Sequence, residues 1–131
     1  MILTRDEHCP PHVHAGNGQW DARFKFSFSD NSVSLWDVTP LRNKPTADVL
    51  EGLRLTLKEK SNLRLAREKW WEMLNNVCLI NQRWDSKAKE VVSGKHSRTG
   101  AIVIKAARFD ASAYKTVLTL SGQTSPVEIK L

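Results

Sequence analysis

The chain has 131 residues, of which 40% are hydrophobic and 26% are charged, and its formal net charge is +6 at pH 7. These proportions are ordinary for a globular protein and exclude a largely disordered chain, while the length favours one domain over two independent ones. No apolar run reaches the roughly 18 residues of a membrane-spanning helix, so we expect no membrane partner.

The charge is unevenly distributed along the sequence. Residues 1–80 contain 11 Lys and Arg against 10 Asp and Glu, whereas residues 81–131 contain 9 against 4. The basic excess in the C-terminal part can attract nucleic acid or an acidic partner, or it can simply keep the protein soluble. The first residues lack the hydrophobic segment of a secretory signal, and the two cysteines lie in different segments, so we expect reduced thiols and a cytoplasmic location.

The segment DEHCPPHVHAG, residues 6–16, contains three of the four histidines. Its adjacent prolines favour an extended backbone, so His12 and His14 are predicted to project from the same side toward the surface. Such a pair is a candidate for acid–base catalysis or phosphate contact, and together with His8 it is a candidate site for a divalent metal such as zinc. Alternatively, the histidines bond only backbone carbonyls or pack against aromatic rings, and the protein then uses no cofactor.

Strands are predicted next in the sequence. Residues 20–28 alternate strictly between an apolar and a polar face. The apolar face consists of Trp20, Ala22, Phe24, Phe26 and Phe28. Turn-forming residues 29–32 then lead to a second strand over residues 33–38, which predicts a hairpin.

Two helices, or one bent helix, follow a break that contains two prolines. Thr46 is a suitable N-cap, and the apolar residues after it recur at helical spacing up to Leu57. A second apolar stripe begins after Ser61 or Asn62 and includes Trp70. Because adjacent helical residues point about 100° apart, Trp70 and Trp71 cannot both face the core, so Trp71 is a candidate contact for a partner or for the rest of the chain.

The remaining sequence is rich in β-forming residues. Residues 77–84 are predicted as a strand and the polar residues 85–100 as a loop, followed by strands within 101–109, 113–120 and 126–131. The predicted fold is therefore α+β: a small antiparallel sheet, formed by the N-terminal strand and the hairpin, packs against two helices. We assign residues 1–75 to this core and residues 76–131 to a basic, β-rich extension packed on the same domain.

The segment EHCPPHVHA, followed by two strands, a proline-bearing break and a helical stretch ending in LAREKWWEML, resembles the bacterial family described as domain of unknown function 4160. The resemblance covers roughly residues 1–75 and places the acidic-His-x-Pro-Pro-His-x-His signature on Glu7, His8, Pro10, Pro11, His12 and His14. It implies a short N-terminal strand, here shortened to residues 1–5, a strand pair and paired helices. It also implies a role in a toxin–antitoxin-like or mobile-element module, without an assigned activity.

Three functions are compatible with these features. The first is a non-enzymatic protein that binds a protein partner, or itself as a homodimer. The second is a histidine-dependent ribonuclease or phosphodiesterase that uses His12 and His14. The third is a nucleic-acid binder that uses the basic C-terminal part. The candidate binding residues are His8, His12, His14, Trp71, Arg83, Lys95 and Arg98.

Overall fold

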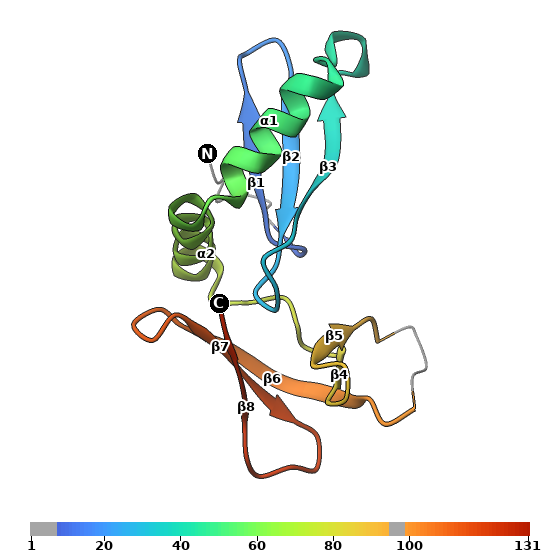
Figure 1. Ribbon diagram of the computed structural model, residues 1–131, viewed down its shortest axis with the longest axis vertical. Coiled ribbons are helices and arrows are strands. Elements are labelled where there is room, and N and C mark those ends of the chain that lie inside the picture. Colours follow the sequence, from blue (N-terminus) through green and yellow to red (C-terminus); the bar gives the residue numbers. More distant parts are fainter. Residues whose placement is uncertain (1–7, 95–98) are drawn as a thin grey trace. The chain divides into compact units, whose positions relative to one another are not determined.

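The structure is a computed structural model, and it describes residues 8–94 and 99–131. Two helices and two antiparallel sheets are present in this part of the chain, which confirms the α+β class (Figure 1). The strand predicted within residues 1–5 lies outside the described residues. None of the described helices is long and apolar enough to cross a membrane.

Contacts within the chain divide it into two compact units. Unit 1 comprises the residues up to Ser27 together with Asn31–Leu74. Unit 2 comprises Phe28–Asp30 and Asn75–Leu131. A short piece of the connection between the second and third strands thus belongs to unit 2, although most of unit 2 follows the helices.

Unit 1 contains a three-stranded sheet in the order β1-β2-β3. Its strands are β1 (His12–Gly16), β2 (Asp21–Phe26) and β3 (Val33–Thr39), and both pairings are antiparallel. The predicted strands over residues 20–28 and 33–38 are confirmed, because β2 and β3 lie within or overlap them. Ala22, Phe24 and Phe26 are all buried, as the alternation predicts.

The helices of unit 1 follow a short 3-10 helix, η1 (Leu41–Asn43). The first is α1 (Ala47–Lys58), and the hydroxyl of Thr46 accepts a hydrogen bond from the Val49 amide, which confirms the predicted N-cap. The second, α2 (Lys60–Leu74), begins slightly before the predicted start. Trp70 is fully buried and Trp71 is half-buried, so the two adjacent indoles do face different surroundings.

The sheet and the two helices of unit 1 all contribute side chains to its core. Apolar side chains of the sheet and of both helices enclose a void of only about 10 Å³, lined by Val13, Phe24, Phe26, Val33, Leu57, Leu63 and Ala66. Arg67 of α2 is also fully buried, and it donates hydrogen bonds to the Ser27 carbonyl oxygen at 2.9 Å and to the Asn31 side-chain oxygen at 3.0 Å. These acceptors compensate the cost of removing the guanidinium group from water.

Unit 2 is a five-stranded antiparallel sheet in the order β5-β4-β6-β7-β8. The strands are β4 (Arg83–Asp85), β5 (Glu90–Val92), β6 (Ile102–Asp110), β7 (Lys115–Leu120) and β8 (Val127–Lys130). The last three confirm the predicted C-terminal strands. The Thr116 hydroxyl, which is buried, donates a hydrogen bond to the Phe28 carbonyl oxygen at 2.6 Å.

Two predictions for unit 2 are wrong. Residues 77–82 do not form a strand, because Cys78 and Asn81 adopt positive φ angles of 64° and 71°, which no extended strand allows. The segment is apolar because Val77 and Leu79 are buried, not because it forms a ladder. Residues 85–100 are not all loop, since β5 lies within them and pairs with β4.

The expectation of reduced thiols is also wrong. Cys9 and Cys78 are both disulfide-bonded, and the chain contains no other cysteine. Disulfides persist mainly in oxidising environments. The expected cytoplasmic location therefore loses the support that it drew from cysteine usage.

Candidate functional site

The predicted histidine pair lies on β1, where the extended backbone places both rings on the same side of the strand. The ring centroids of His12 and His14 are 5.4 Å apart, which confirms that the two side chains lie together. The expectation that both rings face outward is wrong for His12, which is only 2% exposed.

His12 is buried because aromatic rings surround it. Its centroid lies 5.1 Å from the Trp36 ring and 5.2 Å from the Trp70 ring, and its Nδ1 is hydrogen-bonded to the Pro10 carbonyl oxygen at 2.8 Å. These contacts match the structural alternative considered for the histidines. A ring held in this way is poorly placed to reach a substrate.

His14 lies in a different environment, at the wall of an open pocket. Its Nδ1 is 2.8 Å from Oδ2 of Asp21, and the two side chains are 15% and 45% exposed. A carboxylate on one ring nitrogen fixes the orientation of an imidazole and directs the opposite nitrogen away from it. Asp21 is the first residue of β2, and no pattern in the sequence indicates that it contacts His14.

Next to the histidines, the outer face of the sheet carries an ion pair that the sequence analysis did not identify. The register shifts between Arg23 and Phe24, so that Phe24 pairs with Leu35 while Arg23 pairs with Asp37. Trp36 is thus an extra residue of a β-bulge. The Arg23 guanidinium binds both carboxylate oxygens of Asp37, with Nε–Oδ1 at 2.7 Å, and lies 4.0 Å above the Trp36 ring.

This arrangement affects the acidity of Asp37. The hydrogen bonds from Arg23 lower its pKa below the ordinary value of 3.8, and burial opposes them. The positive charge of Arg23, and that of His12 and His14 when protonated, acts in the same direction as the hydrogen bonds. Asp37 therefore keeps its negative charge to a lower pH than an ordinary aspartate does.

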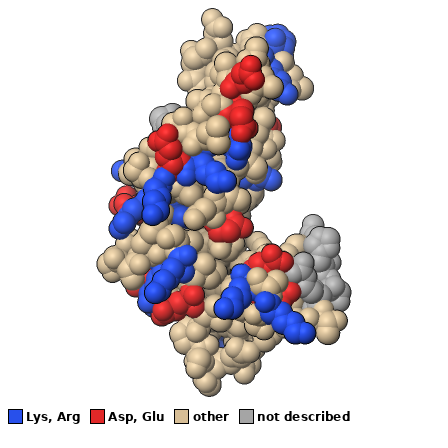
Figure 2. Space-filling model, in the orientation of Figure 1, with Lys and Arg blue, Asp and Glu red and all other residues tan. Residues whose placement is uncertain are grey.

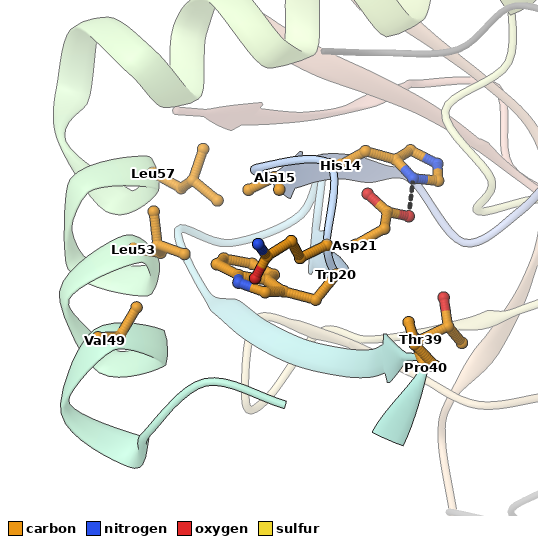
Figure 3. A pocket seen from close by; sticks show the side chains of 12 residues that line it. His14, Ala15, Trp20, Asp21, Thr39, Pro40, Val49, Leu53 and Leu57 are labelled. Atoms are coloured by element: carbon orange, nitrogen blue, oxygen red, sulfur yellow. Dashed lines mark hydrogen bonds and ion pairs between the residues drawn. The ribbon is translucent and has the colours of Figure 1, made fainter. Parts of the chain in front are cut away.

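The pocket beside His14 has a volume of about 900 Å³. Figure 3 shows Val49, Leu53 and Leu57 pointing from α1 toward Ala15 and Trp20, with His14 and Asp21 turned toward each other on the far side. Most of its lining is apolar.

The turn between β1 and β2 forms one end of this pocket. The turn is so tight that it requires glycine at two positions. A side chain at Gly16 would collide with the Trp20 carbonyl oxygen, and Gly18 adopts a φ of +89°, which other residues rarely adopt. The Gln19 amide donates to the side-chain oxygen of Asn17 at 3.0 Å, and the Gln19 carbonyl oxygen accepts a bond of 2.8 Å from Asn43 of η1. These two hydrogen bonds hold Gln19, and with it this end of the pocket, in place.

A second pocket, of about 520 Å³, shares His14 and Leu57 with the first. Its other lining residues come from β1 and α2: Val13, Asn62, Leu65, Ala66, Lys69 and Met73. Because two side chains line both pockets, the pockets meet there. We call the two together the β1 groove; four of the five residues of β1 line it.

The remaining predicted site residues do not join this groove. His8 is exposed and precedes β1, and the half-buried Trp71 is absent from the lining of both pockets. Arg83 is half-buried in β4 of unit 2. Lys95 and Arg98 lie outside the described residues, as does Glu7 of the signature.

The metal-site prediction gains no support from residues 8–94 and 99–131. Nowhere in that part of the chain do three His, Cys, Asp or Glu side chains come close enough together to hold a metal ion. His12 packs against Trp36 and Trp70, and the Asp21 carboxylate beside His14 does not bring three such donors together.

The basic residues do not gather in one field on the visible face of the protein. Figure 2 shows blue and red side chains interspersed there. In unit 2, Lys115 is paired with Glu128 at 2.9 Å. In unit 1, Arg54 is paired with Glu51 at 2.6 Å.

Comparisons of the chain with models of protein families, with curated proteins and with solved structures gave no match.

Proposed function

We propose that this chain is a non-enzymatic protein-binding component that takes an apolar segment of a partner into the β1 groove. The observation that carries the proposal is the groove itself: an open, mainly apolar channel bordered by one strand and two helices. Concave apolar surfaces with a few polar groups are the usual form of binding sites. A toxin–antitoxin-like or mobile-element module is the setting that the sequence resemblance suggests, and we retain it as part of the proposal.

Exposed apolar side chains at the groove support this reading. Val49 is 46% exposed and Leu65 is 54% exposed, and both line the groove. Contiguous exposed apolar surface on a folded protein commonly marks an interaction site. Polar groups lie among these side chains, with the His14–Asp21 pair in the first pocket and Lys69 in the second, and they would orient a bound segment.

The histidine-dependent nuclease is less well supported. A mechanism with two imidazoles needs both rings at the substrate. His12 is buried between two indoles, which leaves His14 with Asp21 as the remaining acid–base candidate. The nucleic-acid-binding alternative would need a continuous basic surface, and on the one face that Figure 2 shows, basic and acidic side chains are interspersed.

The groove is tested by comparing two leucines of the same helix. Leu53 lines the groove, whereas Leu55 does not line it and is 52% exposed. A displayed library of random peptides is selected on the wild-type protein, and the dissociation constant of the best peptide is measured by fluorescence anisotropy. Leu53→Glu is expected to raise that constant by about tenfold or more, because it places a charge in an apolar contact. Leu55→Glu should leave it within about twofold.

Circular dichroism of both variants controls for folding. If no peptide binds, or if Leu55→Glu weakens binding as much as Leu53→Glu, the β1 groove is not the binding site. If the selected peptides carry no apolar side chains, the proposed class of partner is wrong.

A further inference from the structure

Strand β8 (Val127–Lys130) is the outer strand of the five-stranded sheet in unit 2. Among the described residues it pairs only with β7. An outer strand presents one row of backbone N–H and C=O groups that can pair with a further strand. The question is which groups of β8 form that row.

The register between β7 and β8 identifies these groups. Leu131 donates its amide proton to the Tyr114 carbonyl oxygen at 3.2 Å, so these two residues form a hydrogen-bonded pair. In an antiparallel ladder such pairs alternate with non-bonded ones. The register pairs Thr116 with Ile129 and Lys115 with Lys130, so Ile129 bonds to β7. The N–H and C=O groups of Lys130, and likewise of Glu128, point away from β7.

The side chains of β8 also alternate. Val127 and Ile129 are half-buried, on the face that carries Leu118 and Thr116, whereas Glu128 and Lys130 are exposed on the opposite face. The apolar face of the sheet is therefore incompletely covered where it reaches β8. A further strand with the same alternation would continue both faces.

We propose that β8 pairs antiparallel with β8 of a second copy of this chain, about a twofold axis between the two Ile129 residues. In this register Glu128 of each copy lies opposite Lys130 of the other copy. Glu128 and Lys130 both direct their backbone groups outward, so each such pair exchanges two hydrogen bonds. On the other face the two Ile129 side chains meet. Both the charges and the hydrogen bonds of the edge are thus complementary to themselves.

Neighbouring registers lack this complementarity. Moving the twofold axis by one residue places Glu128 opposite Glu128, or Lys130 opposite Lys130, and like charges directly opposite destabilise a strand pair. Within one chain, Lys115 lies opposite Lys130 and binds Glu128 at 2.9 Å. The Glu128 carboxylate of the second copy would place a negative charge opposite Lys130 as well. The proposed register is therefore the one that the charges favour.

The contact is short, and short edge strands limit pairing, so we expect a dissociation constant in the roughly micromolar range. The interface belongs to unit 2 and does not involve the β1 groove. Failure of one proposal therefore leaves the other standing.

Charge exchange tests the register. Sedimentation velocity and light scattering over a series of protein concentrations are expected to show a monomer–dimer equilibrium for the wild-type protein. Glu128→Lys and Lys130→Glu, each alone, place like charges opposite each other twice in the dimer and should raise its dissociation constant by about tenfold. An equimolar mixture of the two variants should form a heterodimer, since every facing pair is then of opposite charge.

The mixture separates loss of the interface from loss of the fold, because misfolded variants would not recover when mixed. Leu53→Glu serves as a matched control and should leave the dimer unchanged. The proposal is overturned if the wild-type protein stays monomeric throughout the series, or if the single variants dimerise as well as the wild type does. It is also overturned if the mixture does not associate, or if denaturing electrophoresis without reductant shows a covalent dimer.

Discussion

Asp37 illustrates how a single bulge residue sets the electrostatics of the outer face in unit 1. Because Trp36 is extra in the register, Asp37 comes opposite Arg23, and the indole supports the guanidinium from one side. A bidentate arginine–carboxylate pair is more directional than a lysine pair would be. The side chains are still 28% and 35% exposed, so the net contribution at neutral pH is expected to stay below about 1 kcal/mol.

The Arg23–Asp37 pair predicts a pH dependence of stability. The folded-state pKa of Asp37 is lowered from 3.8, so the unfolded chain binds the proton more readily than the folded chain does. The stabilisation is therefore present above pH 3.8 and is lost as the pH falls through the lower folded-state value. Acid unfolding followed by tryptophan fluorescence should show a shallower loss of stability for Asp37→Asn than for the wild type.

The variant Arg23→Gln provides the check on this prediction. It removes the cause of the shift, so it should flatten the acid limb in the same way, and the double variant should add little to either single change. Additive effects of the two substitutions would show that the pair does not act as a unit.

Helices and strands differ in how far the sequence determines them. The apolar periodicity and the cap at Thr46 were sufficient to predict α1, and the strict alternation was sufficient for β2, because these signals are local. The strand prediction is wrong for residues 77–82 because an apolar run indicates burial and not backbone conformation. The backbone at Cys78 and Asn81 turns instead, and no local pattern indicates that. β5 was missed because its three residues are too few to show an alternating pattern, although it pairs with the nearby β4 as a hairpin.

The candidate site shows the same limit. The histidine spacing predicted that His12 and His14 lie together, since alternate residues of an extended strand share one side. The burial of His12 depends on Trp70, 58 positions further along, and no sequence rule places that indole. The partnership of His14 with Asp21 depends on the length of the intervening turn. The groove arises where two helices border a strand, so it could not be read from any one segment.

At the scale of one element, α2 depends on a buried arginine. Arg67→Met keeps much of the side-chain volume but leaves the Ser27 and Asn31 oxygens without this donor. Ser27 is half-buried and Asn31 is exposed, so water can partly replace the lost donor, and each lost hydrogen bond costs about 0.5–1.5 kcal/mol. We therefore expect urea denaturation to show a free energy of unfolding lower by roughly 1–3 kcal/mol.

Arg64 provides a control on the same helix. Its side chain is 49% exposed and is paired with Glu68 at 2.9 Å. Arg64→Met should lower the free energy of unfolding by no more than about 0.5 kcal/mol, since exposed pairs at this spacing contribute little. Equal effects of the two substitutions would mean that burial of Arg67 does not matter to stability.

For the whole molecule, the two units carry different surfaces. Unit 1 contains the β1 groove and the outer-face ion pair, and unit 2 contains an outer strand whose charges complement a second copy. Dimerisation through β8 would give each assembly two grooves. If a partner also presents two binding segments, the apparent affinity would then exceed that of a single groove.

The oxidation state of the cysteines is the last property that belongs to the whole chain. Both are disulfide-bonded, so a thiol reagent applied to the denatured protein without reductant is expected to label neither of them. After reduction it should label both, which mass spectrometry of the intact chain can count. Reducing environments keep thiols reduced, so protein prepared from an oxidising compartment is the proper sample. Labelling of either cysteine before reduction would contradict the disulfide and restore the original expectation of free thiols.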